Sequence, residues 1–412
     1  MNSASKPPQT AALNATKSEQ KIPASARLFL KMLNNLKQGH LRIITPDEQH
    51  LLFGDFHQAP SAVLRIHDWR ACQRILRAGD IGFAESYEAG WLESPDLVAL
   101  LRLAIRNENS LEPALFGGKL STLWYRIKHW LRPNTRSGSS RNIHAHYDLG
   151  NDFYRLWLDP SWTYSSAIFD GDYQISLQQA QHQKYQRIID VLQLKAGDQV
   201  LEIGCGWGGF AEHAGKLGIA VHGVTISPSQ LAIAQQRIEQ AKLQDLVRLE
   251  LCDYRDLHGS YDAIVSIEMF EAVGEKYWAG YFATVQQRLK IGGQALIQSI
   301  TIQESRFERY RSGTDFIQQY IFPGGMLPSP ERFCQQAQKQ GLQVKHEYAF
   351  GRDYAETLRR WNQAFNQQLT SIEAQGFGAA FQRIWHMYFA YCEAGFNEGS
   401  TDVYQFLLEK NA

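Results

Sequence analysis

The feature that most constrains the fold of this chain is a glycine-rich turn, LEIGCGWGG at residues 201–209, which follows a short apolar run. Its glycines allow a tight backbone turn and let a ligand approach the start of the next helix. Apolar runs and helical patterns alternate around it. Strands are expected at 199–204, 220–225, 247–252, 263–267, 294–300, 344–350 and 403–408, and helices at 209–217, 229–241, 277–289, 353–375 and 378–396. This alternation predicts an α/β fold with a doubly wound, mostly parallel sheet.

The ligand of the turn can be narrowed from its neighbours. Gly204, Gly206 and Gly209 satisfy the pattern GxGxxG, which also fits a dinucleotide enzyme. However, Glu202 lies two residues before the first glycine and suits an ammonium group better than a pyrophosphate. The second strand ends at Thr225, without the acidic residue that would hold an NAD ribose. The turn therefore favours S-adenosylmethionine (SAM) over NAD.

Residues after the second and third strands complete the expected cofactor site. Thr225 and Gln230 are placed to reach the ribose hydroxyls, although Ser227 between them is also a plain helix N-cap. Asp253 and Tyr254 follow the third strand, where an adenine ring could be met, and an ordinary loop aspartate is nearly as good an interpretation. Together these residues predict a nucleoside-binding edge of the sheet.

Composition limits the class of protein. At 412 residues, with 44% hydrophobic residues, the chain is long enough for two or three globular domains. No apolar run approaches the about 18 residues that cross a bilayer. The five cysteines are scattered without a CxxC pair, which predicts neither a disulfide framework nor a zinc site and favours a reducing cytoplasm.

The net charge of zero hides an asymmetry between the two parts of the chain. Residues 1–141 carry 19 Lys/Arg against 12 Asp/Glu, and residues 142–412 carry 23 against 30. The basic part favours an anionic partner, either nucleic acid or lipid headgroups, while a solvated basic face without a partner is equally open. Residues 119–133 combine Trp, Tyr and basic side chains at helical spacing, which suits a membrane-interface helix or a core helix.

The domain organisation follows from these patterns. We expect a disordered tail at 1–25, a small α+β domain at 26–132, a linker at 133–140, and a catalytic domain at 141–412 with an insertion at 301–330. The small domain should contain two short strands around Pro60, a helix at 69–79 that ends on Gly79, and a helix at 96–107 capped by residues 94–96.

Several longer motifs occur in a fixed order along the chain. They are GFAESYEAGW at 82–91, HYDLGNDFY at 146–154, TYSSA at 163–167, CDYRD at 252–256, MFEAVG at 269–274 and YIFPGG at 320–325. With the glycine-rich turn, they resemble the cyclopropane-fatty-acyl-phospholipid synthases over roughly residues 40–408. The first of them is similar to the N-terminal lipid-associated domain of that family.

This resemblance implies a class I SAM-dependent methyltransferase fold and adds Tyr164 and Ser165 to the cofactor site. It implies that SAM donates a methyl carbon to a double bond in an unsaturated acyl chain of a membrane phospholipid. The basic N-terminal domain would then contact the inner face of the membrane peripherally, and nucleic acid is not expected as a partner. The resemblance is also compatible with a homodimer.

The resemblance further implies a bicarbonate ion that acts as a base during ring closure. The family generally holds it with a Cys, a Glu, a His, an Ile backbone group and a Tyr. The matching positions here are Ser166, Glu271, Gln298, Ile300 and Tyr320. Ser166 and Gln298 depart from the pattern; both can hydrogen-bond an oxyanion, but Gln cannot titrate as His does. A cyclopropane is expected, and a methyl- or methylene-branched chain is the alternative.

Other side chains are open to two interpretations. Glu268 is either an additional acid or base or a strand-end carboxylate near the sulfonium. Three arginines of the insertion either grip a lipid phosphate or pair with nearby glutamates: Arg306, Arg309 and Arg311, with Glu304 and Glu308. His144 and His146 have no ligand partner at metal-binding spacing, so no metal is expected.

Two rival functions remain open at this point. One is a methyltransferase of the same superfamily that acts on a soluble or carrier-bound substrate. The other is a protein that binds lipid or SAM without turnover, which Ser166 and Gln298 motivate.

Overall fold

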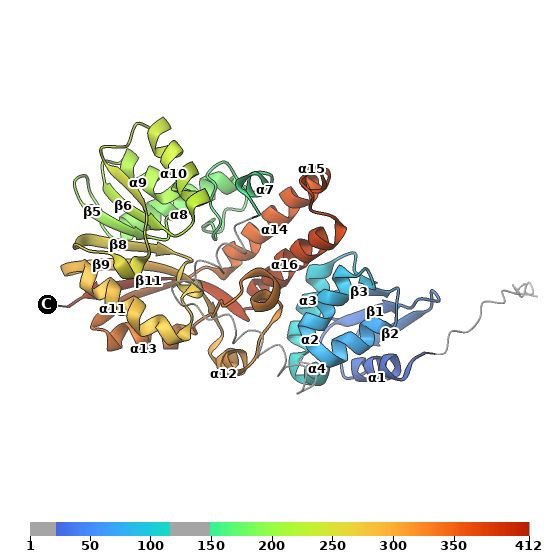
Figure 1. Cartoon of the computed structure of the whole chain (residues 1–412). Helices are drawn as coiled ribbons and strands as arrows, with labels where there is room; N and C mark the ends of the chain where they lie inside the picture. The colour runs from blue at the N-terminus through green and yellow to red at the C-terminus, as the bar shows by residue number, and fades with distance from the viewer. Residues whose placement is uncertain (1–21, 116–148, 412) are drawn as a thin grey trace, which may run out of the picture.

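The computed structural model describes residues 22–115 and 149–411, and the structural statements below concern these residues. Two regions, each with its own sheet, lie side by side (Figure 1). Residues 1–21 of the expected tail, the basic segment at 119–133, the linker at 133–140, and His144 and His146 all lie outside the described residues. The helix α1 (Ala24–Leu33) already includes the last two residues of the expected tail.

The N-terminal region is built on a four-stranded sheet with the order β2-β1-β3-β4. Strands β2 (His50–Gly54) and β3 (Ser61–Ile66) are the pair expected around Pro60. The sequence analysis missed β1 (His40–Ile44), which lies between them, antiparallel to β2 and parallel to β3. The short β4 (Leu92–Glu93) completes the sheet. Alternate residues of β3 are buried, as in a strand with one face against a core.

The helices of this region largely follow the expectation. The backbone of α2 (Arg70–Glu88) leaves helical geometry at Gly79, with φ 60° and ψ −130°, so its first helical segment ends there as expected. A second helical segment, which the sequence analysis did not predict, follows directly and buries further residues such as Ile81 and Ala84. Helix α3 (Leu97–Arg106) begins as expected, with the Asp96 side chain accepting from the N–H of Ala99 at 2.8 Å. Helix α4 (Glu108–Leu115) follows.

The C-terminal region contains a seven-stranded sheet with the order β10-β11-β9-β8-β5-β6-β7. Its strands are β5 (Gln199–Ile203), β6 (Ala220–Thr225), β7 (Val247–Leu251), β8 (Tyr261–Ile267), β9 (Leu289–Ile302), β10 (Leu342–Ala349) and β11 (Thr401–Lys410). Strands β5 to β9 are parallel, and β11 is antiparallel to both neighbours. The expected α/β fold is confirmed. The strand order reverses at β5, which places a crevice at the carboxyl ends of β5 and β8.

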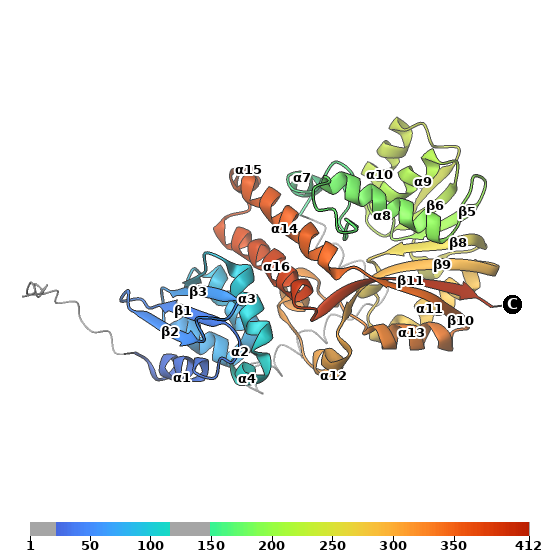
Figure 2. The ribbon, with the colours of Figure 1, turned by 180° about the vertical axis from the view of Figure 1, so that it is seen from behind.

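Helices cover both faces of this sheet (Figures 1 and 2). One core is formed with α8 (Leu177–Val191), α9 (Gly209–Lys216) and α10 (Pro228–Gln240), and the other with α11 (Trp278–Arg288) and α13 (Pro330–Lys339). The expected helix at 353–375 is divided into α14 (Gly351–Gln367) and α15 (Leu369–Ala374). The expected insertion contains α12 (Glu304–Ser312) and a π-helical turn, Ile317–Ile321.

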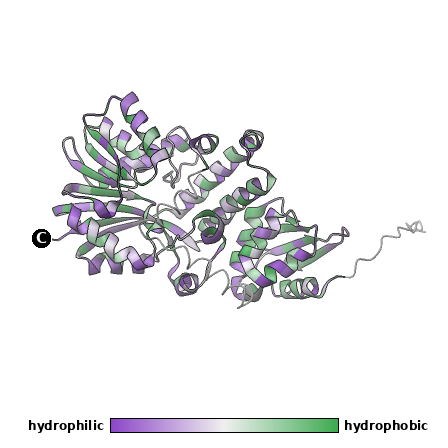
Figure 3. Ribbon diagram, viewed as in Figure 1, coloured by the Kyte–Doolittle hydropathy of each residue, from purple (hydrophilic) through white to green (hydrophobic). Residues whose placement is uncertain are grey.

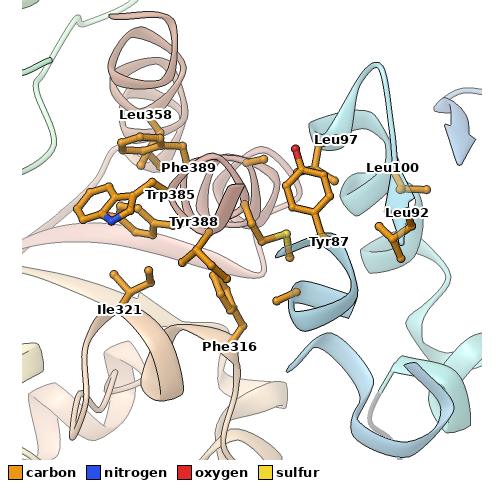
Figure 4. Packing of buried hydrophobic residues seen from close by; sticks show 14 of the residues in the cluster. Tyr87, Leu92, Leu97, Leu100, Phe316, Ile321, Leu358, Trp385, Tyr388 and Phe389 are labelled. Atoms are coloured by element: carbon orange, nitrogen blue, oxygen red, sulfur yellow. The ribbon is translucent and has the colours of Figure 1, made fainter. Parts of the chain in front are cut away.

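The two regions meet at α16 (Ala379–Asn397). The hydroxyl of Tyr87 in α2 lies 2.7 Å from Nδ1 of His386, and the Arg383 guanidinium donates to the backbone carbonyl of Tyr87. Arg102 and Arg106 of α3 both pair with Glu398. Figure 4 shows apolar side chains from both regions at this junction, including Tyr87 and Tyr388. One hydrophobic core therefore runs across the boundary.

Most helices carry both polar and apolar residues (Figure 3). This pattern is typical of helices with one covered face. Within residues 22–115 and 149–411, no helix combines the length and apolarity that crossing a membrane requires.

Candidate active site

A cavity of about 800 Å³ extends from the carboxyl ends of β5 and β6 into the core of the N-terminal region. At one end it is lined by the glycine-rich turn. At the other end it is lined by apolar side chains of the N-terminal region, among them Phe29, Leu33, Leu41, Leu64, Leu103 and Leu111. The volume is in the range of small-molecule sites. Its two ends differ in chemistry, one polar and glycine-lined, the other apolar.

The glycines of the turn have distinct structural roles. A Cβ at Gly204 would lie 2.9 Å from the Met269 side chain, and a Cβ at Gly209 would lie 2.5 Å from the hydroxyl oxygen of Tyr185. Gly206 has φ 51°, yet no described atom lies within 4 Å of the place where its Cβ would be. Packing therefore requires glycine at 204 and 209. At 206, glycine keeps open a space that faces the cavity.

Glu202 stands at the end of β5 with only 3% of its surface exposed. Its Oε2 atom has no hydrogen-bond partner among the described residues. Burial raises the pKa of Glu202 to about 8, and the nearby Lys184 ammonium opposes that rise. A buried carboxylate oxygen without a partner, beside a glycine-lined cavity, fits the ammonium group of a bound ligand.

The residues expected at the nucleoside end line the same cavity. The Thr225 hydroxyl lies 3.3 Å from Oε1 of Gln230, and both side chains are buried. Asp253 forms a salt bridge with Arg255, with 2.5 Å between the closest atoms. The Tyr254 ring packs edge-on against Tyr281. This end holds hydroxyl, amide and aromatic groups suited to a ribose and a base.

Tyr164 and Ser165 contact residues that the sequence analysis missed. The Tyr164 hydroxyl lies 2.9 Å from that of Tyr388, and Ser165 Oγ accepts a hydrogen bond from Lys184 at 2.6 Å. Lys184 is fully buried, and burial lowers its pKa to about 7. A signal existed for it, because Lys184 lies four residues after Ala180 on the buried face of α8.

Two carboxylates line the cavity beyond the glycine-rich turn, Glu268 and Glu271. Oε1 of Glu271 accepts from the backbone N–H of Ile300 at 2.5 Å, while its Oε2 has no partner among the described residues. Burial, and then the charge of Glu268, raise the pKa of Glu271 to about 8. Glu268 is held by Ser166, Gln298 and Tyr354.

The structure brings together four of the five residues that the resemblance assigned to a bicarbonate. The Ser166 N–H and the Gln298 amide both donate to Glu268, and the Ile300 N–H donates to Glu271. These donors are thus engaged by the protein's own carboxylates, and they do not fit a separate anion. Tyr320 is directed elsewhere: its hydroxyl donates to Glu85 of α2 at 2.7 Å.

The arginines of the insertion are paired, although mostly not with the expected residues. Arg306 and Arg309 both contact Glu108 of α4, at 2.7 and 3.2 Å. Arg311 contacts Glu275 at 2.8 Å and the expected Glu308 at 3.6 Å. Arg306 and Arg309 also line the cavity. In the described part of the chain, no group of three His, Cys, Asp or Glu side chains is arranged to hold a metal ion.

Comparison with known proteins supplies the family context. A family model described as mycolic acid cyclopropane synthetase matches residues 134–406. The tuberculostearic acid methyltransferase UfaA1 of Mycobacterium tuberculosis is 39% identical over 369 residues, covering 85% of this chain and 83% of that protein. The cyclopropane-fatty-acyl-phospholipid synthase of Escherichia coli K12 is 33% identical over 359 residues, covering 85% and 88%.

Solved structures agree with these matches. The mycolic acid cyclopropane synthase CmaA1, in complex with SAH and CTAB, superposes with a TM-score of 0.62 and 32% identity. The match covers 66% of this chain and 98% of that one. Coclaurine N-methyltransferase, at 19% identity and a TM-score of 0.59, shares the fold.

Proposed function

This chain belongs to the mycolic acid cyclopropane synthetase family of SAM-dependent, lipid-modifying methyltransferases, and we propose that it transfers the SAM methyl carbon to a double bond of an unsaturated acyl chain in a membrane phospholipid.

The single observation that carries this proposal is the continuity of the cavity. The glycine-rich turn and Glu202 line one end, and the apolar core of the N-terminal region lines the other. A polar nucleoside and a long hydrocarbon chain need such different surroundings, and a transfer between them requires both in one connected space. An enclosed alignment of two reactants can supply several kcal/mol of the barrier.

The cofactor residues have separate roles in this proposal. Glu202 takes the ammonium group of the methionine part, Thr225 and Gln230 take the ribose hydroxyls, and Asp253 with Tyr254 takes the adenine. The turn at Gly204–Gly206 lets the ligand approach the backbone, and Tyr164 and Ser165 close over it. SAM supplies an electrophilic methyl group on a sulfonium.

The acceptor end must tolerate a positive charge on the acyl chain, because attack by an alkene on the methyl group leaves a carbocation. Glu271 lines the cavity, and its carboxylate, whose Oε2 has no partner among the described residues, can stabilise that charge. The aromatic side chains of Tyr164, Tyr354 and Tyr388 line the same space and offer π faces to a cation. Water excluded from this space cannot capture the cation.

The first product that we propose is a cyclopropane fatty acid. A methyl- or methylene-branched chain is the second candidate, and two observations favour it. Gln298 stands where the resemblance places a titratable His, and a relative with 39% identity is a tuberculostearic acid methyltransferase. Both products arise from the same methyl transfer and differ in the fate of the cation.

The substrate also implies a site of action. We propose that the basic N-terminal part, including residues 119–133, docks on anionic lipid, so that the enzyme works peripherally on the cytoplasmic face of the membrane. The apolar end of the cavity lies in this N-terminal region. Pelleting with vesicles that contain phosphatidylglycerol should be lost at high salt, because the attraction between charges is screened.

Labelled SAM and vesicles of an unsaturated phosphatidylglycerol test the reaction directly. We expect label in the acyl chains, and fragmentation of the isolated acids to locate the new carbon. Resistance to hydrogenation identifies a ring, whereas a hydrogenated product identifies a branched alkene. Label only in a soluble amine or a carrier-bound chain would contradict the proposal.

A further inference from the structure

Glu268, directly after β8, occupies a backbone conformation that suits its side chain poorly. Its φ of 49° is in the left-handed region that glycine adopts freely. The Glu268 N–H donates to the Gln298 carbonyl at 2.8 Å, which fixes this backbone against β9. A non-glycine residue held in this way beside a cavity suggests that its side chain has a function.

Three donors from separate segments hold the Glu268 carboxylate. Oε1 accepts from the Ser166 N–H and from Nε2 of Gln298, both at 2.8 Å, and Oε2 accepts from the Tyr354 hydroxyl at 2.7 Å. The orientation of the Gln298 amide is fixed, because its Oε1 accepts from Gln405. All three donors stabilise the charged form of the carboxyl group.

The donors that the resemblance assigned to a bicarbonate ion are bonded to carboxylates of the protein. Ser166 and Gln298 occupy two of the positions that the resemblance assigned to that ion, and both are bonded to Glu268. Ile300, a third position, is bonded to Glu271. A carboxylate resembles bicarbonate in charge and in its oxygen atoms, so the side chain of Glu268 takes the place of the ion.

We propose that Glu268 is the base of this reaction and that the enzyme needs no bicarbonate. The inference rests on the proposed function. The alkene electron pair bonds to the methyl carbon as the S–C bond breaks, and the neighbouring chain carbon becomes a cation. Glu268 then takes a proton from the transferred methyl group and becomes a neutral acid. The electron pair of the broken C–H bond then closes the cyclopropane ring. If a hydride has first moved along the chain to the cation, the same electron pair instead forms the double bond of a methylene branch.

Two further observations support this role. Glu268 lines the cavity and therefore can meet the transferred carbon. Burial is the main cause that raises the pKa of Glu268, and a carboxylate with a raised pKa is a stronger base. Glu271, three residues further on, remains available to stabilise the cation.

Bicarbonate dependence is the first test. In buffer freed of carbon dioxide, the wild-type rate should change less than about twofold when bicarbonate is added. A wild-type rate that falls in this buffer and returns with bicarbonate would overturn the proposal.

Two variants then separate a base from a structural carboxylate. Glu268→Gln keeps the shape but cannot accept the proton, so turnover should fall about 10²- to 10⁴-fold. Glu268→Ala should be equally slow, and bicarbonate, formate or acetate should restore its rate with saturation. In both variants the affinity for SAH, measured by calorimetry, should stay within about threefold of wild type. If Glu268 had only a structural role, its loss would weaken SAH binding as well.

The matched control is Glu393→Gln. Glu393, on α16, is also a buried carboxyl group, but it does not line the cavity. This variant should keep the wild-type rate. If neither Glu268 variant folds, Glu268→Asp serves instead, and its displaced carboxylate should slow turnover while SAH still binds. A Glu268 variant with the wild-type rate contradicts the proposal.

SAM with a trideuterated methyl group separates the two levels of inference. Deuterium in the wild-type acyl chain shows the proposed function, and retention of two of the three deuterium atoms shows that the base acts on the transferred carbon. Retention of all three would refute the role of Glu268 and leave the methyl transfer standing. Absence of deuterium from the lipid would refute the proposed function and this inference with it.

Discussion

The two ends of the cavity are built by different kinds of interaction. At the glycine-rich end, single atoms matter: an unpartnered oxygen of Glu202, an open space at Gly206, a backbone N–H of Ile300 that holds Glu271. At the apolar end, side chains such as Leu64 and Leu103 contribute only shape and hydrophobic surface. Hydrogen bonds and charges are directional, whereas dispersion and hydrophobic contacts are not. The polar end should therefore respond sharply to small changes, and the apolar end gradually.

Glu271→Gln should produce the largest effect and sharpen this contrast most. The amide keeps an oxygen for the Ile300 N–H but loses the charge that stabilises the cation, so kcat/KM should fall about 10²- to 10³-fold. Transfer of labelled methyl to lipid measures this, and SAH affinity should remain. Glu304→Gln, an exposed carboxylate at the start of α12, is the control. A loss below tenfold would mean that the polar end is no more sensitive than the apolar one.

Gly206→Ala should weaken SAM binding by about 1–2 kcal/mol, or roughly 5- to 30-fold, because a methyl group would enter the space facing the cavity. Gly341→Ala is matched to it, with φ 78° and no atom within 4 Å of its Cβ, but distant from the cavity lining. Both variants should lose similar stability in thermal unfolding, and only the first should lose SAM affinity in calorimetry. Unchanged affinity at Gly206 would remove the turn from the cofactor site.

At the apolar end, Ala104→Phe should lower kcat/KM for a long acyl chain by about 1 kcal/mol, or roughly fivefold, because the ring fills part of the cavity. Ala99→Phe, on the same helix α3 but outside the cavity lining, is the control. Vesicles with acyl chains of different lengths measure the effect, which should shrink for shorter chains. Loss of all activity at Ala104 would break the proposed contrast between the ends.

The smallest effect is expected where the two regions meet. Asp80 accepts from the Phe316 N–H, and Asp315 lies close by. Burial raises the pKa of Asp80 to about 6; burial, and then the charge of Asp80, raise that of Asp315 to about 7. Because folding raises the pKa of both carboxyl groups, their protonated forms favour the folded state. This contribution of Asp80 and Asp315 to the free energy of unfolding is complete below pH 4 and is lost as the pH rises through 6 and 7.

Thermal unfolding should therefore give a Tm that falls by a few degrees between about pH 5 and pH 8. Asp315→Asn should flatten that dependence, and the exposed Asp245→Asn should not. A wild-type Tm that rises between pH 5 and pH 8 would contradict the role of Asp80 and Asp315. The same conclusion would follow if Asp315→Asn left the pH dependence of Tm unchanged.

Much of the fold could be predicted because its signals are local. The strands β5 to β9 and the turn at residues 201–209 follow from apolar runs and glycines within a few residues of each other. Two elements were missed: β1, which with five residues is as long as the expected β2, and the second helical segment of α2, which follows the break at Gly79.

The site was predictable only in part. Residues of the glycine-rich turn and of the loops after β6 and β7 could be placed from sequence, because the carboxyl ends of parallel strands meet at one edge. Tyr354 could not be placed, because its hydrogen bond to Glu268 joins residues 86 positions apart in the chain. Tyr320 was expected near Glu271, whereas packing between the two regions directs its hydroxyl to Glu85.

The sequence by itself determined a strand–turn–helix that binds a nucleoside-like ligand, and it determined which carboxylates follow β8. Only the tertiary structure decided what those carboxylates face. Ser166, Gln298 and Tyr354 reach Glu268 from three segments, and the cavity joins the turn to the N-terminal core. The physical reason is range: turns and helices depend on neighbours within a few residues, while a buried charge and a shared cavity depend on which distant surfaces pack together.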